Sequence, residues 1–143
     1  MERVFSSVMP ILIRSVISSS TCNLGQCVAY AGSIFDVQVA VVVPYGSNPD
    51  KCASMESLGA KLIYHGKEFD EARSYAEELS RKRGYTYLHS ANEPRLVEGT
   101  GTYTLEILED QPDIEVIVVP LGGGSGACGT CIAAKGINPN IQV

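Results

Sequence analysis

The uninterrupted apolar run at residues 39–43 constrains the fold more than any other part of the chain. A strand with one solvent-facing side alternates apolar and polar residues, so a run without alternation indicates a strand covered on both faces. From Arg14 onward, short β-branched runs alternate with amphipathic stretches, which is typical of repeated β-α units on a parallel sheet. We therefore predict a three-layer α-β-α domain with a largely parallel sheet.

Turn and capping residues divide the chain into these strands and helices. Asn48 followed by Pro49 is typical of a helix start, and Gly59 of a helix end. The hydrophobic pattern predicts strands at residues 15–18, 38–43, 61–65, 85–88 and 115–119, with a further edge strand at 141–143. It predicts helices at residues 24–33, 48–58, 69–83, 102–109 and 126–135.

The length of 143 residues fits one core, and we assign residues 15–143 to a single α/β domain. Residues 1–14 fit neither the helical nor the strand period and stay unassigned. Pro10 and Arg14 interrupt this apolar beginning and no clear cleavage site follows, so we predict no signal peptide. No segment approaches the ~18 uninterrupted apolar residues of a membrane span. We expect a cytoplasmic protein with no membrane partner.

Charge and cysteine content exclude two further classes. A formal net charge of −5 repels a polyanion, and basic residues cluster at 81–83, where the end of a helix explains them, so we expect no nucleic-acid partner. The five cysteines are an odd number in a chain with a sizeable core, which argues against a disulfide framework. We expect them to be reduced.

A glycine loop follows the predicted strand at 115–119 and opens into a predicted helix. Its residues are Gly122, Gly123, Gly124, Ser125 and Gly126. Without Cβ atoms, consecutive backbone N–H groups can turn toward one point, and the helix start adds partial positive charge. We therefore predict a site for a small phosphorylated ligand.

A hydroxyl-rich loop at residues 18–23 follows the first predicted strand and precedes the helix at 24–33. Hydroxyl, amide and backbone donors at a helix start can bind a carboxylate. A helix cap without a ligand is the other interpretation. Four hydroxyl residues in a row, Ser18 to Thr21, exceed what capping requires.

Several segments carry a family resemblance in order. Residues 20–26 resemble a Ser-x-Gly-Asn-His-Gly/Ala-Gln loop, and 43–51 with 58–60 resemble the strand, helix and turn that follow it. Residues 99–107 resemble a Gly-Gln-Gly-Thr segment before Leu-Glu-Ile, and 122–126 a cofactor phosphate loop. Together they resemble the tryptophan synthase β-like, or fold type II, family of pyridoxal-phosphate enzymes. Threonine and serine dehydratases are the nearest members.

The resemblance, which runs from about residue 16 to residue 143, implies a fold, a cofactor and site residues. The chain would correspond to the small domain and the start of the large domain, and the cofactor would be pyridoxal phosphate. Asn23 matches the residue that contacts the pyridoxal ring oxygen. Ser20, Thr21 and Asn23 match the loop that grips the substrate carboxylate. Gly122, Gly123, Gly124, Ser125 and Gly126 match the phosphate cradle.

The departures from the family pattern concern catalysis. The family joins its cofactor to a lysine upstream of the Ser-x-Gly-Asn loop, whereas the first lysine here is Lys51. That lysine also serves as the base for Cα proton removal. Cys22 replaces the loop glycine and Leu24 the loop histidine, and the chain ends before the residue that would face the pyridine nitrogen. We therefore name no catalytic residue and expect the cofactor to be held non-covalently or lost.

Two hypotheses follow from this pattern. The first is a truncated relative of the dehydratases that is inactive by itself. The second is a non-enzymatic module that binds a phosphate or pyridoxal compound or acts through association. Because truncation exposes apolar surface, we also expect a homodimer or a swapped oligomer.

Other motifs point to weaker alternatives. Gly124, Gly126 and Gly129 fit a G-x-G-x-x-G dinucleotide fingerprint, but no acidic residue follows Glu115 to bind the ribose. Cys128-Gly129-Thr130-Cys131 has the spacing of a redox or metal pair, yet a second pair is absent, so we predict no metal and interpret both thiols as small apolar residues. We interpret His65 and His89 as loop or packing residues.

Overall fold

The computed structural model describes residues 14–21 and 23–143, so predictions made for residues 1–13 and for Cys22 lie outside the described part. The chain divides into two compact units, one ending at Leu88 and the other comprising His89–Val143. Each unit is described by itself. The assignment of residues 15–143 to one domain stays a prediction, since one domain can contain more than one compact unit.

The first unit is a parallel β-sheet with alternating helices. Its elements are β1 Ser15–Ser19, α1 Asn23–Phe35, β2 Gln38–Val43, α2 Pro49–Ser57, β3 Lys61–Tyr64, α3 Phe69–Arg83 and β4 Thr86–Leu88. The strand order is β3-β2-β1-β4, and every pair is parallel. The four predicted strands and three predicted helices of this unit are confirmed, with ends that differ by at most two residues.

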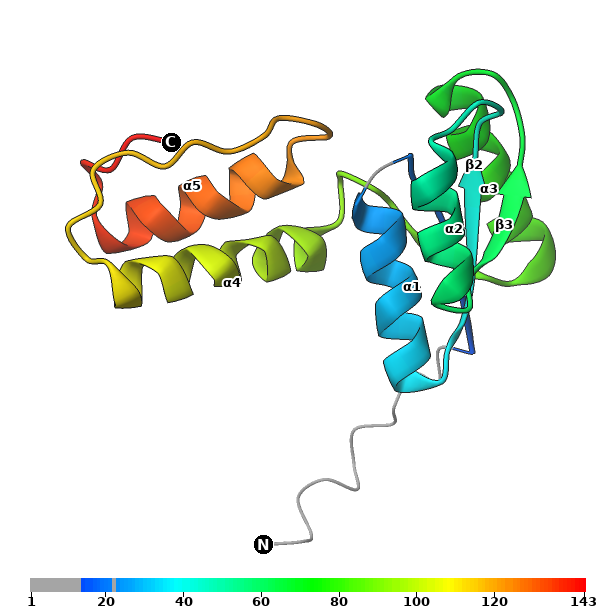
Figure 1. Ribbon diagram of the computed structural model, residues 1–143, viewed down its shortest axis with the longest axis horizontal. Helices are drawn as coiled ribbons and strands as arrows, with labels where there is room; N and C mark the ends of the chain where they lie inside the picture. The colour runs from blue at the N-terminus through cyan, green and yellow to red at the C-terminus, as the bar shows by residue number, and fades with distance from the viewer. Residues whose placement is uncertain (1–13, 22) are drawn as a thin grey trace, which may run out of the picture. The chain divides into compact units, whose positions relative to one another are not determined.

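Strand β2 explains the three layers. Val39, Val41 and Val43 pack with residues of α1 and α2, whereas Ala40 and Val42 pack with α3 on the other face. Figure 1 shows α1 and α2 together on one side of the sheet and α3 on the other. Since successive side chains of a strand point to opposite faces, an all-apolar run needs helices on both. The three-layer α-β-α prediction is confirmed.

Local signals set the ends of the helices. The Asn48 side chain accepts hydrogen bonds from the backbone N–H groups of Asp50 and Lys51, at 2.9 and 3.2 Å. This arrangement caps α2 as the Asn-Pro sequence predicted. Gly59 after α2 and Gly84 after α3 have φ of 88° and 72°, which is the left-handed region that favours glycine.

The first turn of helix α3 contains a carboxylate, Glu71, whose pKa is lowered in the folded protein. Glu71 accepts hydrogen bonds from the backbone N–H groups of Lys67 and Glu68, at 2.6 and 3.3 Å. These bonds favour the ionised carboxylate and lower the pKa of Glu71 below its ordinary value of 4.5. A lowered pKa in the folded state stabilises the fold above pH 4.5, and this stabilisation is lost as pH falls through the folded-state pKa.

We expect Glu71→Ala to lower the thermal midpoint at neutral pH, because both hydrogen bonds are lost. The difference from the native protein should shrink as pH falls through the folded-state pKa of Glu71, and circular dichroism melts at a series of pH values would measure it. Glu56→Ala is the matched control, since Glu56 is exposed on α2. A difference that widens in acid would contradict the assignment.

The second unit contains two long helices side by side. They are α4 Pro94–Asp110 and α5 Ser125–Ile137. Contacts of Thr100 with Ser125 and of Leu108 with Ala134 show that the helices run in the same direction, and the segment between them returns along α5 (Figure 1). The helix at 126–135 is confirmed within two residues.

The predicted start of α4 at residue 102 is wrong, because the helix begins eight residues earlier at Pro94. Gly99 and Gly101 lower helix propensity and gave the sequence the appearance of a loop. In the structure Gly101 lies inside the helix because α5 passes close by: a Cβ at Gly101 would lie 3.2 Å from the carbonyl oxygen of Gly129. Tertiary packing therefore overrides local propensity here.

The predicted strands at 115–119 and 141–143 are wrong. Val116 and Gln142 form an isolated parallel bridge, with hydrogen bonds of 2.8 Å from Ile117 N to Gln142 O and from Gln142 N to Glu115 O. A strand forms only where its backbone pairs with a neighbouring strand. Among the described residues of this unit, the segment at 115–119 pairs only with Gln142, through one bridge. The apolar pattern alone therefore does not make the segment a strand.

Candidate functional site

The glycine loop leads directly into α5, and backbone donors at the start of this helix have no partner among the described residues. Gly124 is the residue before the helix, has φ of 94° and provides no side-chain cap. Its carbonyl accepts from Cys128 N at 2.9 Å. The N–H groups of Ser125, Gly126 and Ala127 make no hydrogen bond to any residue that the structure describes. Three unpaired donors at a helix start fit an anion of phosphate size.

Two side chains of α4 form hydrogen bonds with the first residues of α5. The Thr100 hydroxyl lies 3.0 Å from the Ser125 carbonyl oxygen, and the Tyr103 hydroxyl donates to the Gly126 carbonyl at 3.4 Å. Tyr103 also shares a hydrogen bond with Thr130. The contacts of Thr100 and Tyr103 involve the carbonyl oxygens of Ser125 and Gly126, so they do not use the N–H groups of these residues. A Cβ at Gly123 would lie 3.1 Å from the Ala91 side chain, so the loop also runs close to the chain that follows β4.

Thr100 and Tyr103 contact the candidate site, although the sequence analysis did not name them. Tyr103 is 39% exposed, and its hydroxyl donates to a carbonyl oxygen of the glycine loop. The contacts join residues 23 to 27 positions apart, so a local sequence pattern cannot predict them. The small residues Gly101 and Gly129, one on each helix, were the available signal that α4 and α5 approach closely.

The hydroxyl-rich loop lies at the carboxyl end of the central strand β1. Ser18, Ser19 and Ser20 are buried, Thr21 is half-buried and Asn23 is exposed as the first residue of α1. Ser18 donates to the Leu88 carbonyl at 2.8 Å, and Ser20 Oγ accepts from Gly25 N at 3.0 Å. Ser18 and Ser20 therefore shape the loop, while Thr21 and Asn23 are more accessible.

The sheet order places this loop where α/β proteins bind ligands. The chain moves from β1 through β2 to β3 on one side and then crosses to β4 on the other side of β1. The carboxyl ends of β1 and β4 are thus the point where the strand order reverses, which is the usual ligand crevice of an open parallel sheet. The structure brings Ser20, Thr21 and Asn23 together here, on the first unit, whereas Gly122 to Gly126 lie together on the second.

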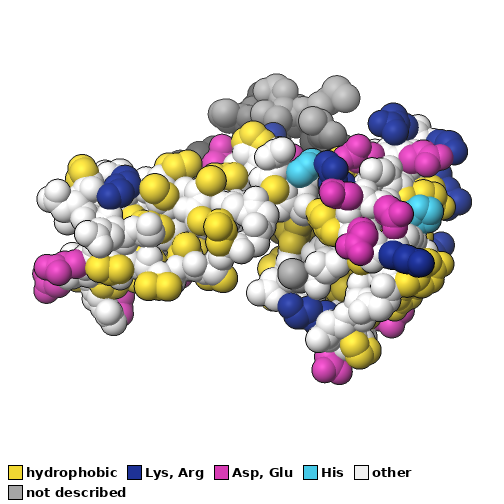
Figure 2. All heavy atoms as spheres, turned by 90° about the horizontal axis from the view of Figure 1, so that it is seen from above, with side chains coloured by type: hydrophobic (Ala, Val, Ile, Leu, Met, Phe, Trp, Pro, Cys, Tyr) yellow, Lys and Arg dark blue, Asp and Glu magenta, His cyan; other side chains and the backbone are white. Residues whose placement is uncertain are grey.

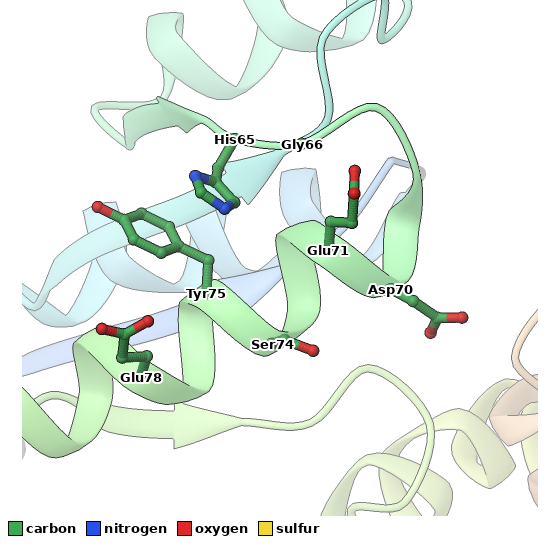
Figure 3. A pocket seen from close by; sticks show the side chains of 7 residues that line it. All are labelled: His65, Gly66, Asp70, Glu71, Ser74, Tyr75 and Glu78. Carbon is green, nitrogen blue, oxygen red and sulfur yellow. The ribbon is translucent and has the colours of Figure 1, made fainter.

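A separate cavity of about 580 Å³ lies between the end of β3 and α3, away from both loops in sequence. Figure 3 shows its lining side chains, with the rings of His65 and Tyr75 stacked at 3.9 Å between centroids. Its carboxylates already have partners: Glu71 binds backbone N–H groups and Glu78 pairs with Lys82, which lowers the pKa of Glu78. The stacking of His65 agrees with a packing role.

The other histidine and the cysteine pair show no sign of a ligand site in the described part of the chain. His89 Nδ1 accepts from the backbone N–H groups of Ala91 and Asn92, both at 3.0 Å, and so shapes a turn. Cys128 and Cys131 are exposed on α5. Over residues 14–21 and 23–143, no group of three or more His, Cys, Asp or Glu side chains is placed to hold a metal. Within the same residues, no helix is long and apolar enough to cross a membrane.

Comparison with known proteins decides the family. The model of the pyridoxal-phosphate dependent enzymes matches residues 12–143. The chain belongs to this family. Membership implies pyridoxal phosphate as the cofactor, which agrees with the N–H groups at the glycine loop that have no partner among residues 14–21 and 23–143.

Relatives of this pyridoxal-phosphate family member include threonine dehydratases. An L-threonine ammonia-lyase of Thermotoga maritima is 40% identical over 91% of this chain and 32% of its own length. The catabolic L-threonine dehydratase TdcB of Staphylococcus aureus is 34% identical over 91% of this chain and 38% of its own. The chain therefore spans about a third of the length of the curated relatives it matches.

Solved structures agree with the sequence relatives. The processed form of threonine deaminase isoform 2 from Solanum lycopersicum superimposes with a TM-score of 0.81 at 35% identity, over 90% of this chain and 36% of that one. The resemblance to fold type II pyridoxal-phosphate enzymes, and to threonine dehydratases among them, is confirmed at the level of family and fold.

Proposed function

We propose that this chain binds the phosphate of pyridoxal phosphate non-covalently at the start of α5 and does not dehydrate threonine or serine by itself. The observation that carries the proposal is that the N–H groups of Ser125, Gly126 and Ala127, which follow the glycine cap Gly124, make no hydrogen bond within the described residues. Backbone donors and the helix dipole together favour a dianion. The odd number of cysteines supports a cytoplasmic location, which is part of this proposal.

The residues present fit the phosphate end of the cofactor better than its aldehyde end. In the family's chemistry pyridoxal phosphate supplies an electron sink, and a lysine holds its aldehyde. No lysine precedes Asn23 in this chain. Lys135 shares a helix with the glycine loop, but it follows Ser125 by ten residues, or about 15 Å of helix, and donates to the Pro139 carbonyl. We therefore derive no covalent step.

The hydroxyl-rich loop supplies the second half of the proposal. By family resemblance, Ser20, Thr21 and Asn23 would orient a carboxylate, and Asn23 would contact the pyridoxal ring oxygen. Exposure of Asn23 at the first position of α1 supports this role, because helix-start donors and the amide are both accessible to a ligand. Ser20 would act by holding the loop through its bond to Gly25.

A second candidate function is threonine or serine dehydration by a longer assembly that includes this chain. The 40% identity to a threonine ammonia-lyase favours it. In that case the chain would contribute the phosphate cradle and the carboxylate loop, and another polypeptide segment would contribute the amine.

The test is a titration of the purified chain with pyridoxal phosphate, with pyridoxal and inorganic phosphate as separate probes. We expect saturable binding of pyridoxal phosphate with inorganic phosphate as a competitor, no binding of pyridoxal, and no 2-oxo acid from threonine or serine. Gly124→Ala should weaken binding about tenfold, since a left-handed non-glycine residue costs ~1–2 kcal/mol.

Gly99→Ala is the matched control, because Gly99 lies on α4 with open space around it. Borohydride reduction followed by peptide mapping reports any covalent attachment. Labelling of one specific lysine together with 2-oxo acid formation would overturn the proposal in favour of the second candidate. Equal binding of pyridoxal and pyridoxal phosphate would show that the phosphate is not recognised.

A further inference from the structure

Three successive peptide groups at the start of α5 have their carbonyl oxygens held by hydrogen bonds. The Gly124 carbonyl accepts from a backbone N–H one turn further along α5, at 2.9 Å. The Ser125 carbonyl accepts from the Thr100 hydroxyl at 3.0 Å. The Gly126 carbonyl accepts from the Tyr103 hydroxyl at 3.4 Å. The last two donors belong to α4, so a neighbouring helix completes a set that α5 begins by itself.

Each of these carbonyl contacts also sets the direction of an N–H group. The carbonyl of one residue and the N–H of the next share one planar peptide group. Fixing the Ser125 carbonyl therefore fixes the direction of the Gly126 N–H, and fixing the Gly126 carbonyl fixes that of the Ala127 N–H. Both N–H groups lie in the first turn of α5, where a helix has no acceptor of its own for them. A hydrogen bond to a carbonyl oxygen also polarises its peptide group, which makes the N–H of that group a stronger donor.

The hydrogen bonds through Tyr103 form a chain with a defined direction. A tyrosine hydroxyl has one hydrogen, and Tyr103 donates it to the Gly126 carbonyl. The bond between the Tyr103 and Thr130 hydroxyls must then use Thr130 as the donor. Thr130 is fully buried, so solvent does not compete for its hydroxyl. The chain of donors therefore runs from Thr130 to Tyr103 to Gly126, and it ends at the peptide group that presents the Ala127 N–H.

The charges of the second unit make the direction of these N–H groups important. His89–Val143 contains two basic residues, Arg95 and Lys135, against seven Asp and Glu residues. Lys135 donates to the Pro139 carbonyl, beyond the C-terminal end of α5. Figure 2 shows that the visible face of this unit is largely uncharged. The attraction of this unit for an anion therefore depends mainly on the backbone donors of α5 and on their orientation.

We propose that Thr100 and Tyr103 are positioning residues of the phosphate site at the start of α5. Thr100 orients and polarises the Gly126 N–H, and Tyr103, with Thr130 as its donor, does the same for the Ala127 N–H. Each side chain acts through a peptide group and not by contact with the ligand. This inference rests on the proposed binding of a phosphate at this helix start.

Nuclear magnetic resonance of the backbone amides, with inorganic phosphate as the probe, measures the three N–H groups separately. In the native chain at saturating phosphate we expect amide shifts at Ser125, Gly126 and Ala127. Thr100→Val removes the hydroxyl, keeps the β-branched shape and should reduce the shift at Gly126. Tyr103→Phe should reduce the shift at Ala127. The shift at Ser125 should persist in both variants, because α5 itself holds the carbonyl of that peptide group.

The affinity for pyridoxal phosphate supplies a second measurement. Thr100 shares one hydrogen between the Val97 and Ser125 carbonyls, and the Tyr103 bond is long. We therefore expect Thr100→Val and Tyr103→Phe each to raise the dissociation constant about threefold. Thr130→Val should have part of the effect of Tyr103→Phe and add nothing to it in the double variant, because both changes interrupt one chain. Thr130→Ser keeps the donor and should retain the native affinity.

Tyr30→Phe is the matched control for the loss of a tyrosine hydroxyl, because Tyr30 is exposed on α1 in the other unit. An equal reduction of all three amide shifts in Thr100→Val and Tyr103→Phe would overturn the inference, because it would mean that the whole helix moves. Native amide shifts and native affinity in both variants would also overturn it. If phosphate shifts none of the three amides in the native chain, the proposed function is itself wrong and this inference is lost with it.

Discussion

Gly129→Ala is expected to lower the free energy of unfolding of the second unit by about 3 kcal/mol or more, at the upper end of overpacking effects. A Cβ at Gly129 would lie 2.4 Å from Thr100 Oγ1, 2.5 Å from the Val97 carbonyl oxygen and 2.7 Å from Gly101 N. Two of these three atoms belong to the backbone of α4. The helices must therefore separate, and the contacts that hold the start of α5 separate with them.

The comparison that isolates this clash is Gly99→Ala on α4. Gly99 is exposed and has open space around its Cβ position, so alanine there should stabilise the helix by up to ~1 kcal/mol through propensity alone. Urea unfolding followed by circular dichroism would measure both variants. Thr100→Ala should not rescue Gly129→Ala, because the backbone atoms of Val97 and Gly101 remain in place. A full rescue would show that the side chain alone sets the helix separation.

The same position connects stability to the proposed site. Thr100 contacts the Ser125 carbonyl, and Tyr103 contacts the Gly126 carbonyl, one turn away from the Gly129 crossing. If α5 moves outward, both contacts are lost. Gly129→Ala should therefore weaken pyridoxal-phosphate binding as well as folding, although Gly129 provides none of the proposed donors.

The sheet could be predicted from the sequence because its information is local. The run at residues 39–43 requires cover on both faces, and the structure supplies α1 and α2 on one face and α3 on the other. Asn48-Pro49, Gly59 and Gly84 end or begin helices by their own backbone chemistry. None of these inferences needs a contact with a distant residue.

The second unit was predicted less well because its structure depends on distant contacts. Gly101 is helical since it lies against Gly129, and the segment at 115–119 lacks a strand because one bridge, to Gln142, is its whole pairing within the described residues. A strand pattern states what a segment can pair with but not whether a neighbour is present. The extra turns of α4 and the missing strand have this same origin.

The candidate site shows the same division. The positions of the glycine loop and the hydroxyl-rich loop followed from composition and order, and the structure places each at a helix start. The side chains that contact the glycine loop could not be predicted in this way, because Thr100 and Tyr103 lie on another helix, α4. The buried Ser18 and Ser20 also proved to bond within the first unit, so part of the hydroxyl run serves the fold.

Gly25 and Met55 should be strongly coupled, because the contact at this position involves a side chain rather than backbone. A Cβ at Gly25 would lie 2.4 Å from Met55 Sδ, and Met55 is 1% exposed in the core between α1 and α2. We expect Gly25→Ala to cost ~1–3 kcal/mol through overpacking and Met55→Ala ~2–5 kcal/mol through the cavity it leaves.

The double variant should cost less than the sum by ~0.5–3 kcal/mol, because the alanine methyl at residue 25 enters space that Met55→Ala vacates. A double-mutant cycle from urea unfolding measures this coupling. Leu79→Ala in place of Met55→Ala is the matched control, since Leu79 packs on the opposite face of the sheet and should add independently. Additive costs for Gly25 and Met55 would mean that the helix moves away instead. In that case the Gly25 N–H would leave Ser20 Oγ, and the carboxylate loop would lose its support along with the core.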